Sequence, residues 1–171
     1  MTTTTSRRPV VSLPTETQIL LTRRFDVPRR LVFRAWTEPE QVKRWWTAGR
    51  GDPTLVEIDL RVGGTWRYLM TFPDGERLAF HGEYRIVVPS ERLVWTEIGE
   101  QPPALTVVKT LTLDDAPLAD RPGTTLALLT EFTTREERDA YVGMMGDGFE
   151  QASRLLEACA RELEAAEAAG S

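Results

Sequence analysis

The chain has 171 residues, with 21 Lys and Arg against 26 Asp and Glu, which gives a formal net charge of −5 at neutral pH. A mildly acidic chain binds polyanions poorly, so this balance argues against nucleic acid and anionic membrane surfaces as partners. The single cysteine, Cys159, excludes an internal disulfide framework, and the single histidine, His81, excludes metal sites built from several histidines.

The two ends of the chain are expected to lie outside the folded core. Residues 1–15 are rich in Thr, Ser and Arg and contain too little apolar surface to offset the entropy of ordering them, so they are predicted to be a disordered tail. Residues 167–171 are predicted to be a frayed C-terminus, which leaves a single domain over 16–166. The N-terminus lacks the apolar segment of a signal peptide and no apolar run is long enough to span a membrane, so a cytoplasmic protein is expected.

The first elements are a strand and two short helices. Residues 17–26 are rich in Ile, Leu and Phe and predict a strand. Pro28 then stands where proline favours a helix start, and residues 28–36 place apolar side chains on one face at helical spacing. A second short helix is predicted from Pro39 to about Trp46.

The middle of the chain is dense in strands. Strand patterns cover 55–60, 65–72, 77–88, 92–98, 105–113 and 124–132. The turns between them are short, and Pro73-Asp74-Gly75 is typical of a hairpin. With the first strand, the pattern predicts an antiparallel, curved sheet of six to seven strands.

One long helix is predicted from Arg135 to about Glu164, with Thr133 and Glu136 as a capping box and an apolar stripe at a spacing of three to four residues. Gly143, Gly146 and Gly148 interrupt it, and each costs roughly 0.8–1 kcal/mol relative to alanine. Two explanations are open: a kink or helix start at these positions, or the removal of side chains so that a ligand fits beneath the helix.

Local motifs follow this order of elements. They lie at 24–36 (RFDVPRRLVFRAW), 43–46 (KRWW), 61–68 (RVGGTWRY), 73–75 (PDG), 82–94 (GEYRIVVPSERLV) and 148–156 (GFEQASRLL). Together they resemble the SRPBCC superfamily, the START-like or Bet v-type helix-grip fold, and within it the branch named after the activator of heat-shock-protein ATPase homologue. The resemblance covers residues 17–164. Relatives usually carry Gly-Trp in the last helix where this chain has Gly148-Phe149, which keeps an aromatic ring and removes an indole N–H donor.

The resemblance implies an α+β fold in which the long C-terminal helix packs across the curved sheet over a hydrophobic cavity. Aromatic residues give such a cavity large apolar area with polar tips. The candidate cavity residues are Trp36, Trp45, Trp66, Tyr68, Met70, Phe80, Tyr84, Trp95, Met145, Gly148, Phe149 and Ala152. Since Trp45 and Trp46 are adjacent, only one of them is expected to face the cavity.

No residue is assigned a catalytic role from the sequence. Strand alternation places His81 on the outer face, and Cys159 lies on the apolar stripe of the last helix, as expected of a buried thiol. The strand carboxylates considered for acid or base chemistry are Glu57, Asp59, Glu83, Glu97 and Glu131. No metal site and no cofactor are predicted.

Three functions stay open. The first is a binding protein that holds an apolar, aromatic or acyl small molecule in its cavity. The second is a co-chaperone-like domain that stimulates a heat-shock-protein ATPase, and the third is an enzyme of the cyclase or dehydratase type, which requires a buried titratable group near the cavity. A small apolar ligand, a chaperone and a second copy of the chain, paired through an exposed sheet edge, are the expected partners.

Overall fold

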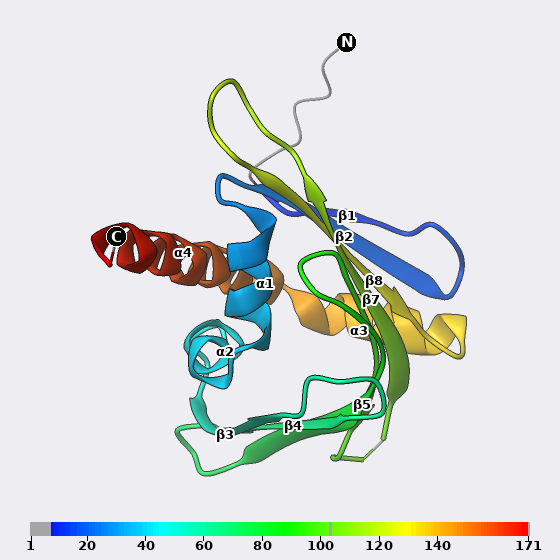
Figure 1. The fold of residues 1–171 in the computed structure, drawn as a ribbon. Helices are drawn as coiled ribbons and strands as arrows, with labels where there is room; N and C mark the ends of the chain where they lie inside the picture. The colour runs from blue at the N-terminus through cyan, green and yellow to red at the C-terminus, as the bar shows by residue number, and fades with distance from the viewer. Residues whose placement is uncertain (1–7, 103, 171) are drawn as a thin grey trace.

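The computed structural model describes residues 8–102 and 104–170. One antiparallel sheet dominates it, with the strand order β1-β2-β8-β7-β6-β5-β4-β3. Figure 1 shows the sheet curving around helices α1, α2 and α4, which lie on its concave side. We call this concave side the inner face and the opposite side the outer face. This α+β architecture confirms the predicted fold class.

The sheet is an antiparallel meander completed by the N-terminal strands. The meander runs through β3 (Asp52–Ile58), β4 (Thr65–Thr71), β5 (Arg77–Val88), β6 (Arg92–Gly99), β7 (Thr106–Asp115) and β8 (Thr124–Glu131). Strand β2 (Gln18–Phe25) pairs with β8, and β1 (Val10–Ser12) pairs with β2. The chain reaches the far edge of the sheet from β2 through α1 (Arg29–Thr37) and α2 (Pro39–Trp45).

The strand count of six to seven is therefore wrong, because the sheet has eight strands. The additional strand is β1, which lies in the segment expected to be a tail. Val10 and Val11 pair with Thr22 and Leu21, so backbone hydrogen bonding orders a segment whose side chains are about half exposed. Residues 1–7 of the expected tail lie outside the described residues.

The C-terminal helix is divided into α3 (Arg135–Met145) and α4 (Gly148–Ala169). Gly146 causes the break, since its φ of 49° and ψ of −133° are closed to residues with a Cβ atom. This supports the explanation of the glycines as a kink. The capping box forms one residue later than expected, between Thr134 and Glu137.

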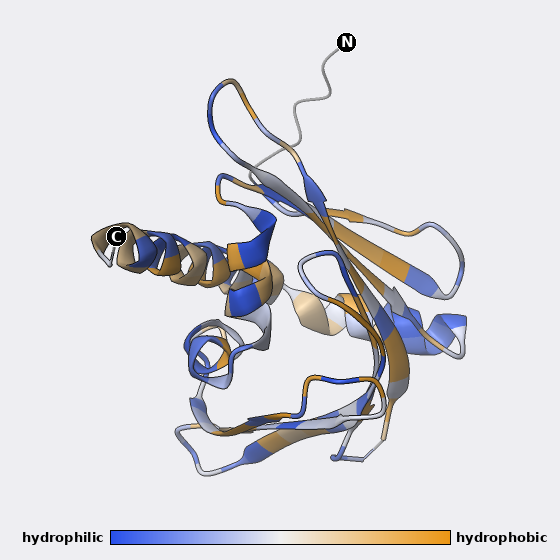
Figure 2. Ribbon diagram, viewed as in Figure 1, coloured by the Kyte–Doolittle hydropathy of each residue, from blue (hydrophilic) through white to orange (hydrophobic). Residues whose placement is uncertain are grey.

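Helix α4 carries both hydrophilic and hydrophobic residues along its turns (Figure 2). Its apolar stripe buries Leu156, Cys159 and Ala160, and α4 packs against α1 and α2. The helix continues through 167–169, where fraying was expected. Glu167 holds this end, at 2.7 Å from Arg30 and 3.2 Å from Arg34 of α1.

Two features of β5 shape the sheet. A Cβ atom on Gly82 would lie 1.8 Å from the Thr96 carbonyl oxygen, so only glycine permits this close approach of β5 and β6. The Trp66 indole uses the same space to donate to the Thr96 carbonyl at 3.1 Å. A register shift between Tyr84 and Ile86 then turns Ile86 outward, although uninterrupted alternation from the inward Tyr84 would place it inward.

Candidate functional site

Aromatic rings cover the inner face in two adjoining groups. In the first, Trp36 of α1 lies 4.8 Å from the ring of Trp45 of α2 and 6.2 Å from that of Trp95 of β6. The Trp45 indole donates to the Ala35 carbonyl at 2.8 Å, which fixes its orientation. This group joins the two short helices to the middle of the sheet.

The second group contains Trp46, which was not among the candidate residues. Its ring lies 5.2 Å from Tyr68 and 6.1 Å from Phe80, in edge-to-face arrangements, and Trp66 lies 4.7 Å from Tyr68. The expectation that only one of Trp45 and Trp46 faces inward is therefore wrong. Trp46 follows the last residue of α2, and both indoles reach the core from the end of this short helix.

The candidate residues divide by exposure. Trp45, Trp66, Tyr68, Met70, Tyr84 and Trp95 are buried. Trp36, Phe80, Met145, Phe149 and Ala152, together with Trp46, pack against the core and are only partly buried. Several aromatic and apolar residues of this group therefore keep part of their surface accessible to solvent.

Gly148 has a different neighbour from the one expected. A Cβ atom at this position would lie 2.3 Å from the Arg50 guanidinium nitrogen Nη2, so the arginine side chain occupies the space beside it. Arg50 also lies 3.9 Å from Asp147 at the start of α4.

Two tyrosine hydroxyl groups stand on the inner face without partners. Tyr68 of β4 and Tyr84 of β5 are 9% and 5% exposed, and neither hydroxyl forms a hydrogen bond with another described residue. Among the described residues, the only fully enclosed side-chain nitrogen or oxygen that lacks a partner is Arg24 Nη2. The two hydroxyl oxygens are therefore not fully enclosed, and each keeps some contact with solvent.

The electrostatics of these hydroxyls follow from their position. Burial raises the pKa of Tyr68 well above its usual value, and the neighbouring Tyr84 and Glu97 raise it further. Burial also raises the pKa of Tyr84. Both groups therefore stay protonated at neutral pH, and each keeps an O–H donor.

An ion pair that the sequence reasoning missed lies beside them. Lys109 of β7 is 3.1 Å from the Glu97 carboxylate of β6, and both side chains are largely buried. Burial by itself would lower the pKa of Lys109, but Glu97 and the Tyr141 hydroxyl of α3 outweigh it and raise the pKa. The signal was present in the sequence, because Lys109 shares the strand phase of the buried Val107 and Leu111.

The comparisons with known proteins agree with this geometry. The family model described as Activator of Hsp90 ATPase homolog 1-like protein matches residues 26–161. The chain belongs to this family. No match was found among curated proteins.

Solved structures from bacteria share the fold of this family member. A protein from Nitrosomonas europaea is 26% identical with a TM-score of 0.76, and the alignment covers 90% of this chain and 99% of that one. A protein from Chromobacterium violaceum is 28% identical with a TM-score of 0.69, covering 84% and 96% of the two chains. A Mycobacterium smegmatis protein, at 22% identity, a TM-score of 0.75 and coverage of 87% and 94%, shows the fold alone.

Glu97 is one of the strand carboxylates considered for acid or base chemistry, and it lies on the inner face. Glu57 and Glu83 are exposed on the outer face, and Glu131 accepts a hydrogen bond from Gln18 at 3.1 Å. Cys159 is buried, which raises the pKa of its thiol, so it has the character of an inert core residue.

A second buried cation, Arg23, connects the last helix, α4, to the sheet. Arg23 of β2 is 5% exposed, and its Nη1 donates to the Ser153 carbonyl of α4 at 2.5 Å. It also lies 4.0 Å from Glu157 and 4.6 Å from the centre of the Phe25 ring. Burial lowers the pKa of Arg23. These contacts hold α4 over the inner face.

The outer face has a polar hollow of about 380 Å³ over β3, β4 and β5. Arg67 makes two hydrogen bonds of 2.9 Å to the Glu100 carboxylate, and His81 lies 3.1 Å from the same carboxylate. His81 thus faces outward, as strand alternation predicted. These three charged or polar groups satisfy one another.

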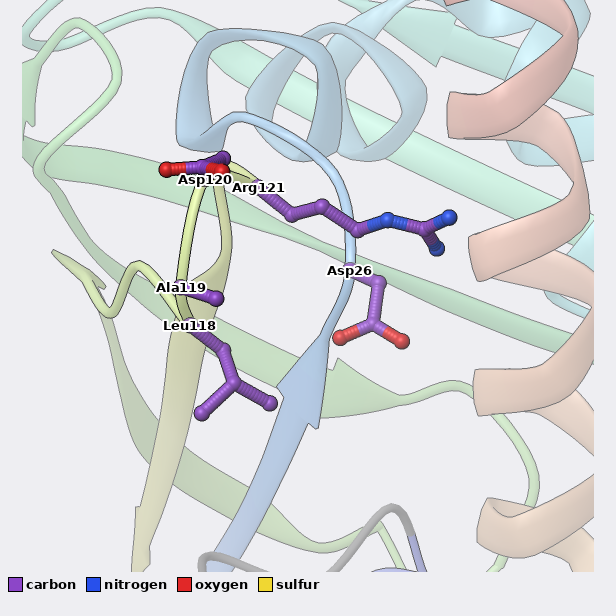
Figure 3. Close-up of a pocket in the computed structure, with 5 residues that line it drawn as sticks. All are labelled: Asp26, Leu118, Ala119, Asp120 and Arg121. Atoms are coloured by element: carbon purple, nitrogen blue, oxygen red, sulfur yellow. The ribbon is translucent and has the colours of Figure 1, made fainter.

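A further hollow, of about 350 Å³, lies between the end of β2 and the β7–β8 loop. In Figure 3 the Arg121 side chain extends from this loop on the same side as the Asp26 carboxylate. Asp26 is already 3.4 Å from Arg24 and 3.9 Å from Arg161. Within the described residues, no group of three or more His, Cys, Asp or Glu side chains could hold a metal ion, and no helix is long and apolar enough to cross a membrane.

Proposed function

We propose that this chain binds a small apolar or aromatic molecule on the inner face of its sheet. One observation carries the proposal: rings that pack against the core from the inner face, among them Trp36, Trp46 and Phe80, keep part of their apolar surface exposed. Water in contact with such surface is released when an apolar molecule covers it, which favours binding by roughly 25 cal/mol per Å².

The helices support the same proposal. Phe149 and Ala152 of α4 and Met145 of α3 are also partly exposed and pack against the same core. A ligand between these helices and the sheet would contact apolar side chains on both sides, as in most small-molecule sites. Ala152 is small and partly exposed, so a larger side chain at this position provides a direct test.

The test is to fill this space from α4. The uncharged fluorescent probe N-phenyl-1-naphthylamine is titrated into the wild-type protein and into the Ala152→Phe variant. Saturable binding to the wild type and at least a tenfold weaker affinity in the variant are expected. Ala158→Phe is the matched control, because Ala158 is exposed on the same helix. Absence of saturable wild-type binding, or equal affinity in all three proteins, contradicts the proposal.

A second readout is thermal stability. A molecule that binds only the folded state at 100 times its dissociation constant adds about 2.7 kcal/mol to the free energy of unfolding. A panel of apolar and aromatic metabolites screened by melting temperature, with Trp fluorescence as the signal, then identifies the class of natural ligand. Any hit is incubated with the protein to check for turnover.

The family description supports an alternative, a protein-interaction domain that stimulates a heat-shock-protein ATPase. This alternative predicts a higher ATPase rate when the full chain is added to the chaperone. The two functions separate in one experiment, because Ala152→Phe should leave such stimulation intact. No change in ATPase rate with the wild-type chain removes the alternative.

An enzyme of the cyclase or dehydratase type would require titratable groups on the inner face, and Glu97 and Lys109 are two such groups. Each is however engaged by the other at 3.1 Å, and Lys109 is held by Tyr141 as well. Because each group is already occupied by the other, neither is free to face a substrate, and the binding function is favoured over catalysis.

A further inference from the structure

The buried tyrosine hydroxyls carry an inference about the kind of ligand, and this inference rests on the proposed function. Leaving a hydroxyl without a hydrogen bond in a protein interior costs about 1–3 kcal/mol. Tyr68 and Tyr84 are both more than nine-tenths buried, on adjacent strands and on the same face. Because the two hydroxyl oxygens are not fully enclosed, water can satisfy them in the free protein, and a ligand that covers them must take over their hydrogen bonds or bear this cost.

The surroundings of the two hydroxyls exclude a purely structural partner. Tyr68 pairs with Phe80 across β4 and β5, and Tyr84 pairs with Trp95 across β5 and β6. The rings of Trp46 and Trp66 contact Tyr68 edge to face. These neighbours along and across the strands are aromatic, so the two hydroxyls are polar groups within a largely aromatic wall.

The charge around this wall selects against an ionised ligand. Each of the three buried cations in residues 8–102 and 104–170 is engaged: Lys109 by Glu97, Arg23 by the Ser153 carbonyl and Glu157, and Arg138 by the Thr15 carbonyl and Asp139. A carboxylate entering here would lose its hydration without gaining a free counter-ion, which is costly. Glu97 would also repel it.

We propose that Tyr68 and Tyr84 bind the polar end of a neutral aromatic ligand, by donating hydrogen bonds to its carbonyl or hydroxyl oxygen while the surrounding rings contact its apolar body. The tyrosines thereby select ligands that carry an oxygen acceptor over pure hydrocarbons. Lys109 and Glu97, as a neutral pair, select uncharged molecules over carboxylates.

The experiment uses three probes of similar shape, measured by equilibrium dialysis with the full chain. 2-Acetylnaphthalene carries a carbonyl oxygen, 2-ethylnaphthalene lacks it, and 2-naphthoate replaces it with a carboxylate. The wild type should bind the ketone about fivefold more tightly than the hydrocarbon, which corresponds to one net hydrogen bond. It should bind the carboxylate most weakly.

Tyr68→Phe, Tyr84→Phe and the double variant then test the donors. In the double variant the ratio of ketone to hydrocarbon affinity should fall to about one, with the hydrocarbon dissociation constant unchanged. That unchanged constant is the internal control for folding and for the apolar wall. A ratio that survives in the double variant overturns the assignment of the tyrosines.

The outcomes separate the inference from the proposed function. If the wild type binds hydrocarbon and ketone equally, the inference fails and the binding function stands. If the carboxylate binds most tightly, the selection for neutral ligands is wrong. If neither the ketone nor the hydrocarbon binds, both the inference and the proposed function fail.

Discussion

The two faces of strands β4 and β5 use neighbouring residues in opposite ways. On the outer face, Arg67, His81 and Glu100 satisfy one another and remain partly exposed. On the inner face, one residue further along β4, Tyr68 is 9% exposed and its hydroxyl has no hydrogen-bond partner among the described residues. The outer hollow is thus lined by groups that satisfy one another, whereas the inner face keeps two hydroxyls that have no hydrogen-bond partner among the described residues.

The largest expected effect concerns the charges of the two faces. Glu97→Gln leaves the Lys109 ammonium group in the core without its counter-ion and should lower the free energy of unfolding by about 3 kcal/mol. Glu100→Gln removes an exposed pair on the outer face and should cost far less. Urea denaturation of both variants measures the difference. Equal losses would mean that Lys109 is not held in a low-dielectric interior.

A second comparison concerns the break between α3 and α4. Gly146→Ala introduces a Cβ atom at a φ of 49° and should destabilise the fold by about 1–3 kcal/mol. Gly143→Ala is the control, because Gly143 is exposed, helical and without neighbours within 4 Å, and it should stabilise by about 0.5–1 kcal/mol. Thermal melts of both variants suffice. Stabilisation by Gly146→Ala would show that the break is not required.

The tyrosines make a smaller prediction that needs no ligand. Because the Tyr84 hydroxyl has no partner among the described residues, Tyr84→Phe should leave the free energy of unfolding unchanged or raise it by up to about 1 kcal/mol. A loss of ligand selectivity without a loss of stability is the pattern expected of a binding group. Destabilisation by more than about 1 kcal/mol would indicate that the hydroxyl has a structural partner.

The smallest effect is a pH dependence on the outer face. Hydrogen bonds from Arg67 and then His81 lower the pKa of Glu100 to about 2, from an ordinary value of 4.5. The folded state thus holds this proton less tightly than the unfolded state, so the stabilisation is present above pH 4.5 and is lost as the pH falls towards 2. Because the group is close to solvent, the effect should be small and should shrink with added salt. Acid denaturation of wild type and Glu100→Gln, at low and high salt, checks this.

Much of the architecture could be predicted because it depends on local patterns. The alternation in 65–72 placed Trp66, Tyr68 and Met70 inward, and the glycines near 146 raised a kink as one of two open explanations. The position of the break could be located only from the backbone conformation. Of the three glycines, only Gly146 has a positive φ. Strand β1 was not predicted because backbone pairing with β2 orders it. The side chains of Val10 and Val11 give no sign of that pairing in the sequence.

The candidate site shows the same difference between what local sequence patterns predict and what tertiary contacts decide. The sequence by itself determined which residues face inward along most of the strands, because side chains alternate with a period of two. Ile86, beyond the register shift in β5, is an exception. The sequence also supplied the aromatic content and the family. Only the tertiary structure decided that Trp46 joins Tyr68, that Glu97 meets Lys109, and that two hydroxyls have no hydrogen-bond partner among the described residues. Such contacts join residues that are distant along the chain, and they depend on how strongly the sheet curves and where the short helices end.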